Sequence, residues 1–147
     1  MTRDLLLRIL DEAYDRKAWH GPNLRAAIHG LTPNQAFWRP AEEAHNTWDL
    51  VLHCAYWKFV VWRRLTGVRG VKFPREGRNF FATPEPTPRA WREDVRVLDD
   101  AHHTLRDAIE RMPERALATR MRLVYGAAMH DVYHAGQIRL LRRLYED

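Results

Sequence analysis

GAAMHDVYHAGQIRLLRRL, residues 126–144, is the stretch that decides the fold and the candidate site of this 147-residue chain. In a helix, seven positions of this region share one face. They are Leu123, Ala127, His130, His134, Gln137, Leu141 and Leu144. His130 and His134 therefore lie one turn apart on a face that is otherwise apolar. Two imidazoles so placed can bind one metal ion, whereas burying them without partners costs free energy.

Helical periodicity also dominates the rest of the chain. Apolar residues recur at helical spacing in four long segments, at about residues 2–20, 48–65, 87–111 and 123–145. Gly21-Pro22 breaks the first segment, residues 23–29 resume it as helix, and a short turn begins at Thr32-Pro33. Because no strand pattern or repeat is present, the sequence predicts an all-α four-helix bundle.

The connection between the second and third long helices, at about residues 67–88, is rich in proline and glycine. A loop of this length in a small domain is usually functional or mobile. It also permits a crossover, so an up-down-down-up order is feasible. The length of the chain predicts one domain over residues 1–147.

Composition excludes several classes of protein. A hydrophobic content of 46% is too high for a disordered chain, and no apolar run approaches the length of a membrane span. No signal peptide is expected at the start, and a single cysteine, Cys54, predicts a cytoplasmic protein without an internal disulfide. The net charge is +5, but no run of five basic residues occurs, so nucleic acid is not the expected partner.

A third histidine occupies the same kind of position on the second long helix. His53 shares a face with Leu50, Trp57 and Val60, so it is flanked by apolar residues and can approach His130 and His134 in the core. Three nitrogens with one open position are typical of a catalytic zinc-type site, which binds water or a thiol there. The alternative is three core histidines, each bonded to a neighbouring carbonyl or carboxylate.

Two stretches carry a family resemblance. NTWDLVLH, residues 46–53, and HDVYHAGQI, residues 130–138, resemble the DinB/YfiT-like superfamily, and the similarity extends from Leu5 to Leu144. The resemblance implies an up-down-down-up bundle with a divalent metal ion on the three histidines, and often a homodimer. Some members of the family are transferases or isomerases that use low-molecular-weight thiols. Three imidazoles accept zinc or nickel, and also copper, iron or manganese.

Further residues are candidates for the pocket and for catalysis. Gln137 follows His134 by one turn, and His20 lies at the helix break, so both are candidate catalytic groups. The candidate pocket residues are Trp57, Tyr133, Phe80 and Phe81, the two phenylalanines forming a lid. Three arginines in or near the loop can meet an anionic substrate group, namely Arg75, Arg78 and Arg89.

Three other residues near these motifs are expected to have other roles. Asp131 makes the motif HDxxH, one methylene shorter than the HExxH of zinc proteases, and no downstream third ligand follows. A structural or supporting role is therefore expected for Asp131 rather than that of a protease base. His102 and His103 are adjacent, cannot share one helix face, and are both predicted to face solvent or a subunit contact.

Two functions of different classes remain open from the sequence. The first is a metal-dependent enzyme, with thiol S-transfer slightly preferred over hydrolysis because the motif holds no clear general base. The second is a non-catalytic metal-binding or ligand-binding module associated with stress. An open ion site beside a pocket of a few hundred Å³ favours catalysis, and a fourth protein ligand favours a structural ion.

Overall fold

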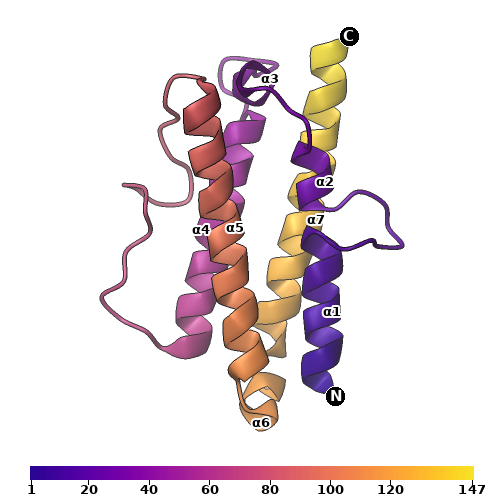
Figure 1. The fold of residues 1–147 in the computed structure, drawn as a ribbon, viewed down its shortest axis with the longest axis vertical. Helices are drawn as coiled ribbons and strands as arrows, with labels where there is room; N and C mark the ends of the chain where they lie inside the picture. The colour runs from indigo at the N-terminus through magenta and orange to yellow at the C-terminus, as the bar shows by residue number, and fades with distance from the viewer.

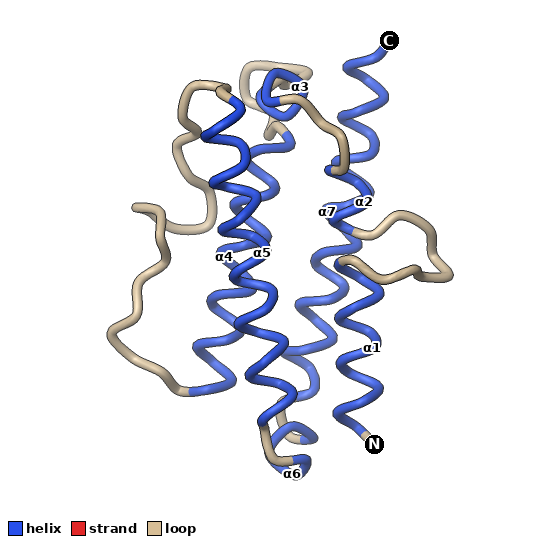
Figure 2. Tube along the Cα trace, viewed as in Figure 1, coloured by secondary structure: helices blue, strands red, loops and turns tan.

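The computed structural model describes residues 1–147 and confirms the all-α class. Its helices are α1 (Thr2–Tyr14), α2 (Leu24–Ile28), α3 (Pro33–Phe37), α4 (Thr47–Thr66), α5 (Pro88–Arg111), α6 (Glu114–Ala118) and α7 (Met121–Glu146). The long helices lie side by side, with α1 and α7 running upward and α4 and α5 downward in Figure 1. Figure 2 shows that loops, not strands, make every connection.

The first helix ends earlier than the sequence predicted. α1 ends at Tyr14 rather than near His20, and residues 15–23 project from the bundle as a loop (Figure 1). Trp19 in this loop is 101% exposed. Asn23 closes the loop, because its side chain donates to the carbonyl of Arg16 and accepts the N–H of Ala26, which starts α2. Both α1 and α2 pack against α7.

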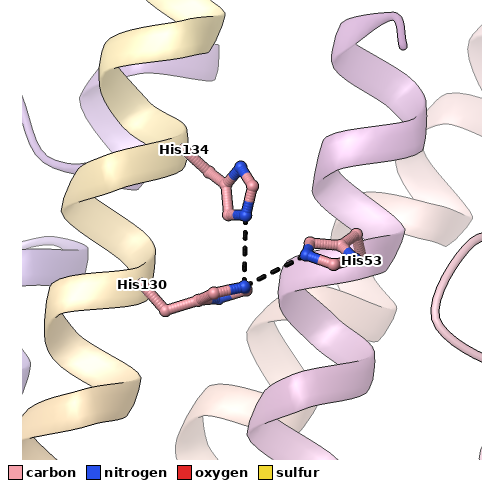
Figure 3. A group of neighbouring side chains, drawn as sticks. All are labelled: His53, His130 and His134. Carbon is pink, nitrogen blue, oxygen red and sulfur yellow. Dashed lines mark hydrogen bonds between the residues drawn. The ribbon is translucent and has the colours of Figure 1, made fainter.

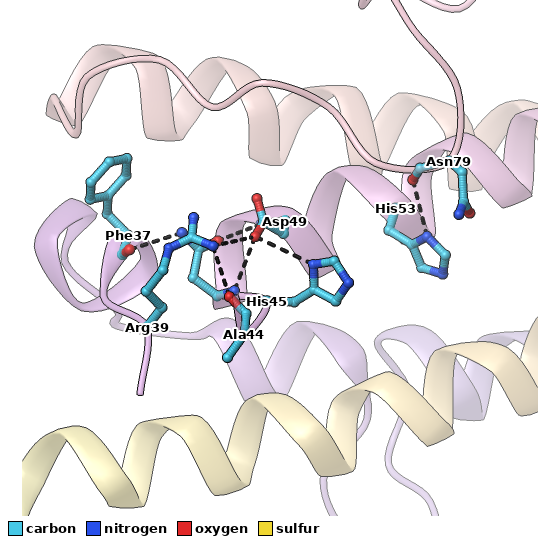
Figure 4. Close-up of polar contacts among 8 residues, drawn as sticks. Phe37, Arg39, Ala44, His45, Asp49, His53 and Asn79 are labelled. Carbon is cyan, nitrogen blue, oxygen red and sulfur yellow. Dashed lines mark hydrogen bonds and ion pairs between the residues drawn. The ribbon is translucent and has the colours of Figure 1, made fainter. Parts of the chain in front are cut away.

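Capping residues set both ends of α4. Asn46 and Asp49 form a reciprocal capping box at the start of the helix. Gly67, with a φ of 71°, ends the helix in the left-handed conformation that glycine tolerates. Asp49 also accepts from Arg39 at 3.3 Å, which ties residues 38–46 to the start of α4 (Figure 4).

The core consists of two apolar clusters separated by a polar layer. One cluster is centred on Trp48, Leu98 and Ile138, and the other contains Leu105 and Val124. Between them along α4, α5 and α7 lie three buried polar side chains, Lys58, His102 and Asp131. None of the helices combines the length and the apolar character needed to cross a membrane.

Candidate metal centre

The structure brings together the three histidines that the sequence singled out. His53 comes from α4, and His130 and His134 come from consecutive turns of α7 (Figure 3). The Nε2 atom of His130 lies 3.0 Å from Nε2 of His53 and 3.1 Å from Nε2 of His134. Nitrogens that share one ion at about 2.0–2.1 Å can lie at most about 4.2 Å apart. The separations therefore fit a shared ion.

The hydrogen bonds of the outer ring nitrogens fix which atoms carry protons. Nδ1 of His53 lies 3.0 Å from the carbonyl of Asn79, and Nδ1 of His134 lies 2.6 Å from Oε1 of Gln137. Both oxygens are acceptors, so each Nδ1 holds the proton of its neutral ring. The Nε2 atoms of His53 and His134 consequently point lone pairs at His130.

Counting protons shows that the cluster is incomplete by itself. A single N–H on Nε2 of His130 can be donated to only one of the two neighbouring lone pairs. The other contact is then between two lone pairs, which repel. A cation among the three Nε2 atoms removes this repulsion and uses every lone pair, so the donor set fits a bound metal ion.

Burial keeps the three rings in the neutral form that binds metal. Desolvation lowers the pKa of His53 and of His134, and lowers the pKa of His130 to about 3. Because the three rings are neutral near pH 7, no proton has to leave before an ion binds.

A second group of ligand-type atoms lies beside the first but suits an ion less well. Cys54, His130 and Asp131 also offer ligand atoms within 4.8 Å of one another. Burial raises the pKa of the Cys54 thiol, which keeps it protonated, and Asp131 is paired with Lys58. The three-histidine set is therefore the better site for an ion.

The loop between α4 and α5 completes the surroundings of His53. Asn79 has a φ of 65° and is the only residue other than glycine with a positive φ, a conformation that asparagine tolerates. Its carbonyl faces Nδ1 of His53 (Figure 4), and its side-chain oxygen accepts from the Trp57 indole at 2.8 Å. Sequence reasoning missed Asn79, because the contact to His53 is made by a backbone atom.

Phe80 covers the face of His53. Its ring stacks on His53 with centroids 4.4 Å apart, and its other side stacks on His45 at 3.8 Å. Phe81 differs from the prediction, because it is buried in the core against Phe73 and Tyr56 rather than over the histidines. The two side chains leave the loop toward different neighbours, so only Phe80 covers His53.

The remaining pocket candidates lie at different distances from the cluster. The Trp57 ring lies 6.4 Å from that of His53 and 6.5 Å from that of His130. A groove of about 290 Å³ between α4 and α7 is lined by both Trp57 and His130. Tyr133 contacts His134 edge-on but is 65% exposed, so it borders the site from outside.

The two catalytic candidates are placed very differently. Gln137 accepts from Nδ1 of His134, so it orients a candidate metal ligand instead of reaching toward substrate. His20 is exposed in the projecting 15–23 loop and makes no hydrogen bond with the three histidines. The structure thus joins Gln137 to the centre and leaves His20 apart from it.

A buried polar layer lies directly beside the histidines. Lys58 is 1% exposed and pairs with Asp131, and its Nζ atom also lies 3.3 Å from Nδ1 of His102. The prediction that His102 faces solvent is wrong, since His102 is buried and stacks on Tyr14. Burial and Lys58 lower the pKa of His102 to about 2, so it accepts from Lys58 as a neutral ring.

The structure also places the three arginines proposed for an anionic group. Arg75 pairs with buried Asp94, and Arg89 pairs with Glu93 on the same helix. Arg78 makes no ion pair and lines a hollow beside Trp57. Only Arg78 of the three is therefore free to meet a ligand.

Comparison with known proteins identifies a family for this chain. A family model described as the DinB superfamily matches residues 16–138, which include all three histidines and most of the chain. No curated protein and no solved structure matches the chain.

Proposed function

Since the chain belongs to the DinB superfamily, we propose that it is a metal-dependent enzyme that uses the ion on His53, His130 and His134 to activate a small molecule. The observation that carries this proposal is the convergence of three proton-poor Nε2 atoms beside a groove. The group holds three protein ligands, which leaves coordination positions for substrate.

The residues around the centre have separate tasks in this proposal. His53, His130 and His134 hold the ion, while Asn79 and Gln137 fix the orientation of two of the rings. Phe80 and Trp57 exclude water from one side, and the groove at His130 admits the substrate. When bound, the ion supplies Lewis acidity that lowers the pKa of a thiol or of water.

Thiol S-transfer is preferred over hydrolysis. Hydrolysis needs a free general base close to the ion. Asp131 is the carboxylate adjacent in sequence to His130, but it is fully buried and held by Lys58. A thiol starts from a pKa of about 8.5, far below the value of about 15.7 for water, so it can release its proton to solvent on binding the ion without a protein base, and the thiol route fits the chain better.

Zinc or nickel is the ion proposed, ahead of iron or manganese. Imidazole suits zinc, nickel, copper and iron, whereas manganese is better served by oxygen ligands. The donor set is three imidazoles without a carboxylate, whereas non-haem iron sites typically combine two histidines with one carboxylate, so zinc or nickel fits better than iron.

The alternative is a non-catalytic metal-binding or ligand-binding module. It predicts an ion with no exchangeable position, and hence no response of the bound ion to added thiol. A shift in the absorption spectrum of the cobalt-substituted protein on adding thiol separates the two functions, because only an exchangeable position lets sulfur bind.

Elemental analysis of the purified protein tests the centre. We expect about one divalent ion per chain, falling near zero in His53→Ala and His134→Ala, because two imidazoles hold an ion poorly. The exposed His103→Ala is the matched control and should keep the ion. Unchanged metal in both ligand variants contradicts the proposal.

Activity is tested separately on the metal-loaded protein. Low-molecular-weight thiols are offered with an alkyl halide, and halide release and thiol consumption are followed together. We expect turnover with at least one thiol that disappears in His134→Ala. Turnover of an ester with no thiol present would favour hydrolysis instead.

The homodimer implied by the family resemblance remains a prediction. Four large apolar side chains on α7 are exposed along one stripe, which supports an interface there: Met129, Tyr133, Leu140 and Leu144. Light scattering after gel filtration should give twice the chain mass, and Leu140→Asp should reduce it to one.

A further inference from the structure

A hollow of about 520 Å³ lies where the end of α4 meets the start of the following loop. Trp57, Val60 and Gly67 form part of its wall. Four arginines line the same hollow, namely Arg63, Arg64, Arg69 and Arg78. No carboxylate lines it, so four positive charges converge without a counter-charge.

The guanidinium groups of these four arginines are free. None of them makes an ion pair or donates a side-chain hydrogen bond, and Arg63 has only the Phe59 ring beneath it. Elsewhere nine arginines pair with carboxylates: Arg3, Arg8, Arg16, Arg25, Arg39, Arg75, Arg89, Arg106 and Arg142. Other arginines, such as Arg115 and Arg139, also lack an ion pair, so what distinguishes the hollow is that four free guanidinium groups line one concavity that no carboxylate lines.

Helix electrostatics explain only part of this arrangement. Arg63 and Arg64 lie in the last turn of α4, where basic residues interact favourably with the helix dipole. Arg69 and Arg78 come from the loop and gain nothing from that dipole. Their convergence on the same hollow concentrates positive potential in a concave site, which attracts anions.

The adjoining hollow extends the positive field. It shares Arg63 and Arg78 with the first and adds Lys72, with Glu76 as its single carboxylate. The third arginine there, Arg75, is already neutralised by Asp94. Guanidinium groups bind carboxylate and phosphate oxygens in bidentate fashion, so the free groups suit either anion.

Trp57 connects this hollow to the metal centre. Its ring lines the arginine hollow and also the groove that contains His130. Its indole N–H is held by Asn79, which is next to Arg78 in the loop and also contacts His53. The arginine hollow and the groove at His130 therefore share Trp57 as a wall residue.

We propose that this hollow, lined by Arg63, Arg64, Arg69 and Arg78, is a binding site for the anionic end of a small polyanionic substrate, bearing phosphate or several carboxylates. The assignment of this ligand as substrate rests on the proposed function, but the binding of the anion does not. The anion binds to the arginines whether or not the ion is present.

The test is calorimetric titration of tripolyphosphate into the whole chain, with citrate as the probe in a second titration. The protein is first stripped of metal with EDTA and desalted, and both titrations are made at about 0.15 M salt. We expect saturable binding of one anion per chain by at least one probe. In R69Q/R78Q that binding should weaken about tenfold or more, because two charge-assisted contacts are lost. The probe that binds more tightly identifies the anionic group.

R115Q/R139Q is the matched control, since it removes the same charge from two exposed arginines without ion pairs on α6 and α7. Equal weakening in both double variants, or no saturable binding of either probe, overturns the proposal. A single-stranded oligonucleotide that binds more tightly than both probes and is lost in R69Q/R78Q also overturns it.

Because the protein is stripped, the result is independent of the metal. Anion binding without metal binding in the elemental analysis would refute the proposed function and leave the anion site standing. Metal binding without anion binding would refute the anion site and leave the proposed function standing.

Discussion

Two clusters of buried polar side chains lie next to each other in the bundle. They differ in whether the hydrogen-bond donors suffice for the acceptors. In the polar layer, the Lys58 ammonium donates hydrogen bonds to Asp131 and to His102. A positive donor therefore meets one negative and one neutral acceptor. In the metal centre, three neutral rings meet with too few protons for their contacts. The clusters adjoin at consecutive residues, His130 and Asp131.

The difference separates a structural histidine from a candidate metal ligand. His102 and His134 are both buried helical histidines with lowered pKa values. His102 accepts from an ammonium and needs nothing more, whereas His134 directs a lone pair at another ring. Partner identity, rather than burial or spacing, therefore separates a histidine that is satisfied by the protein from one that could hold a metal.

The largest expected effect is on stability, from Lys58→Met. The substitution leaves Asp131 buried without its cation, and breaking a buried pair by removing one partner costs about 3–5 kcal/mol. Urea unfolding followed by circular dichroism measures it in EDTA. Lys72→Met, in the exposed loop, is the control and should change stability by less than about 0.5 kcal/mol.

A second variant guards this prediction against simple misfolding. Lys58→Met combined with Asp131→Leu removes both charges and should recover much of the loss. If Lys58→Met lowers the unfolding free energy by less than about 1 kcal/mol, the contrast between the two clusters fails. The polar layer would then not depend on the charge of Lys58.

The next effect is a pH dependence from His102. Its pKa is about 2 when folded, against 6.5 for a free ring. Between these values the unfolded chain binds a proton that the folded protein does not, so stability falls as pH falls below about 6.5. From pH 6.5 to 4.5 this ring alone lowers the unfolding free energy by about 2.3 kcal/mol.

Unfolding curves in EDTA at several pH values isolate the contribution of His102. His102→Leu should reduce the slope by about 1.4 kcal/mol per pH unit, while His103→Leu, at the exposed neighbouring position, should not. An equal slope in His102→Leu and the wild type would mean that the ring is charged in the folded protein.

The smallest expected effect is on metal affinity and concerns the three-histidine cluster. Gln137→Leu removes the acceptor that fixes His134 and should lower metal affinity about ten- to hundredfold. Competition with a chromophoric chelator measures the affinity. Gln137→Glu keeps an acceptor oxygen and should not weaken binding; a loss as large as that in Gln137→Leu would show that the hydrogen bond is not responsible.

Much of the fold could be predicted from the sequence, because the residues that begin and end its helices act locally. Asn46, Gly67 and Pro88 mark the ends of α4 and the start of α5, and each acts through its own backbone or cap. The early end of α1 had no such signal. Residues 15–18 are compatible with helix, and the loop is closed by Asn23 bonding back to Arg16.

The site was readable only where side chains repeat at helical spacing. His53, His130 and His134 follow from apolar faces, but Lys58 was not identified, because a lysine on a helix ordinarily faces solvent. Its partners are on other helices, so its burial depends on packing rather than on neighbouring sequence. Asn79 acts through its carbonyl, which every residue type carries.

The hydrogen bond between His53 and the Asn79 carbonyl has a kinetic consequence. His53 cannot turn its ring out of the cluster while Nδ1 holds that carbonyl, and residues 78–80 cannot lift while the ring stays. Backbone opening of this short segment and departure of the ring are therefore one event. The opening rate measured by amide hydrogen exchange at Phe80 would then set the limit on how fast His53 could turn away from a bound ion.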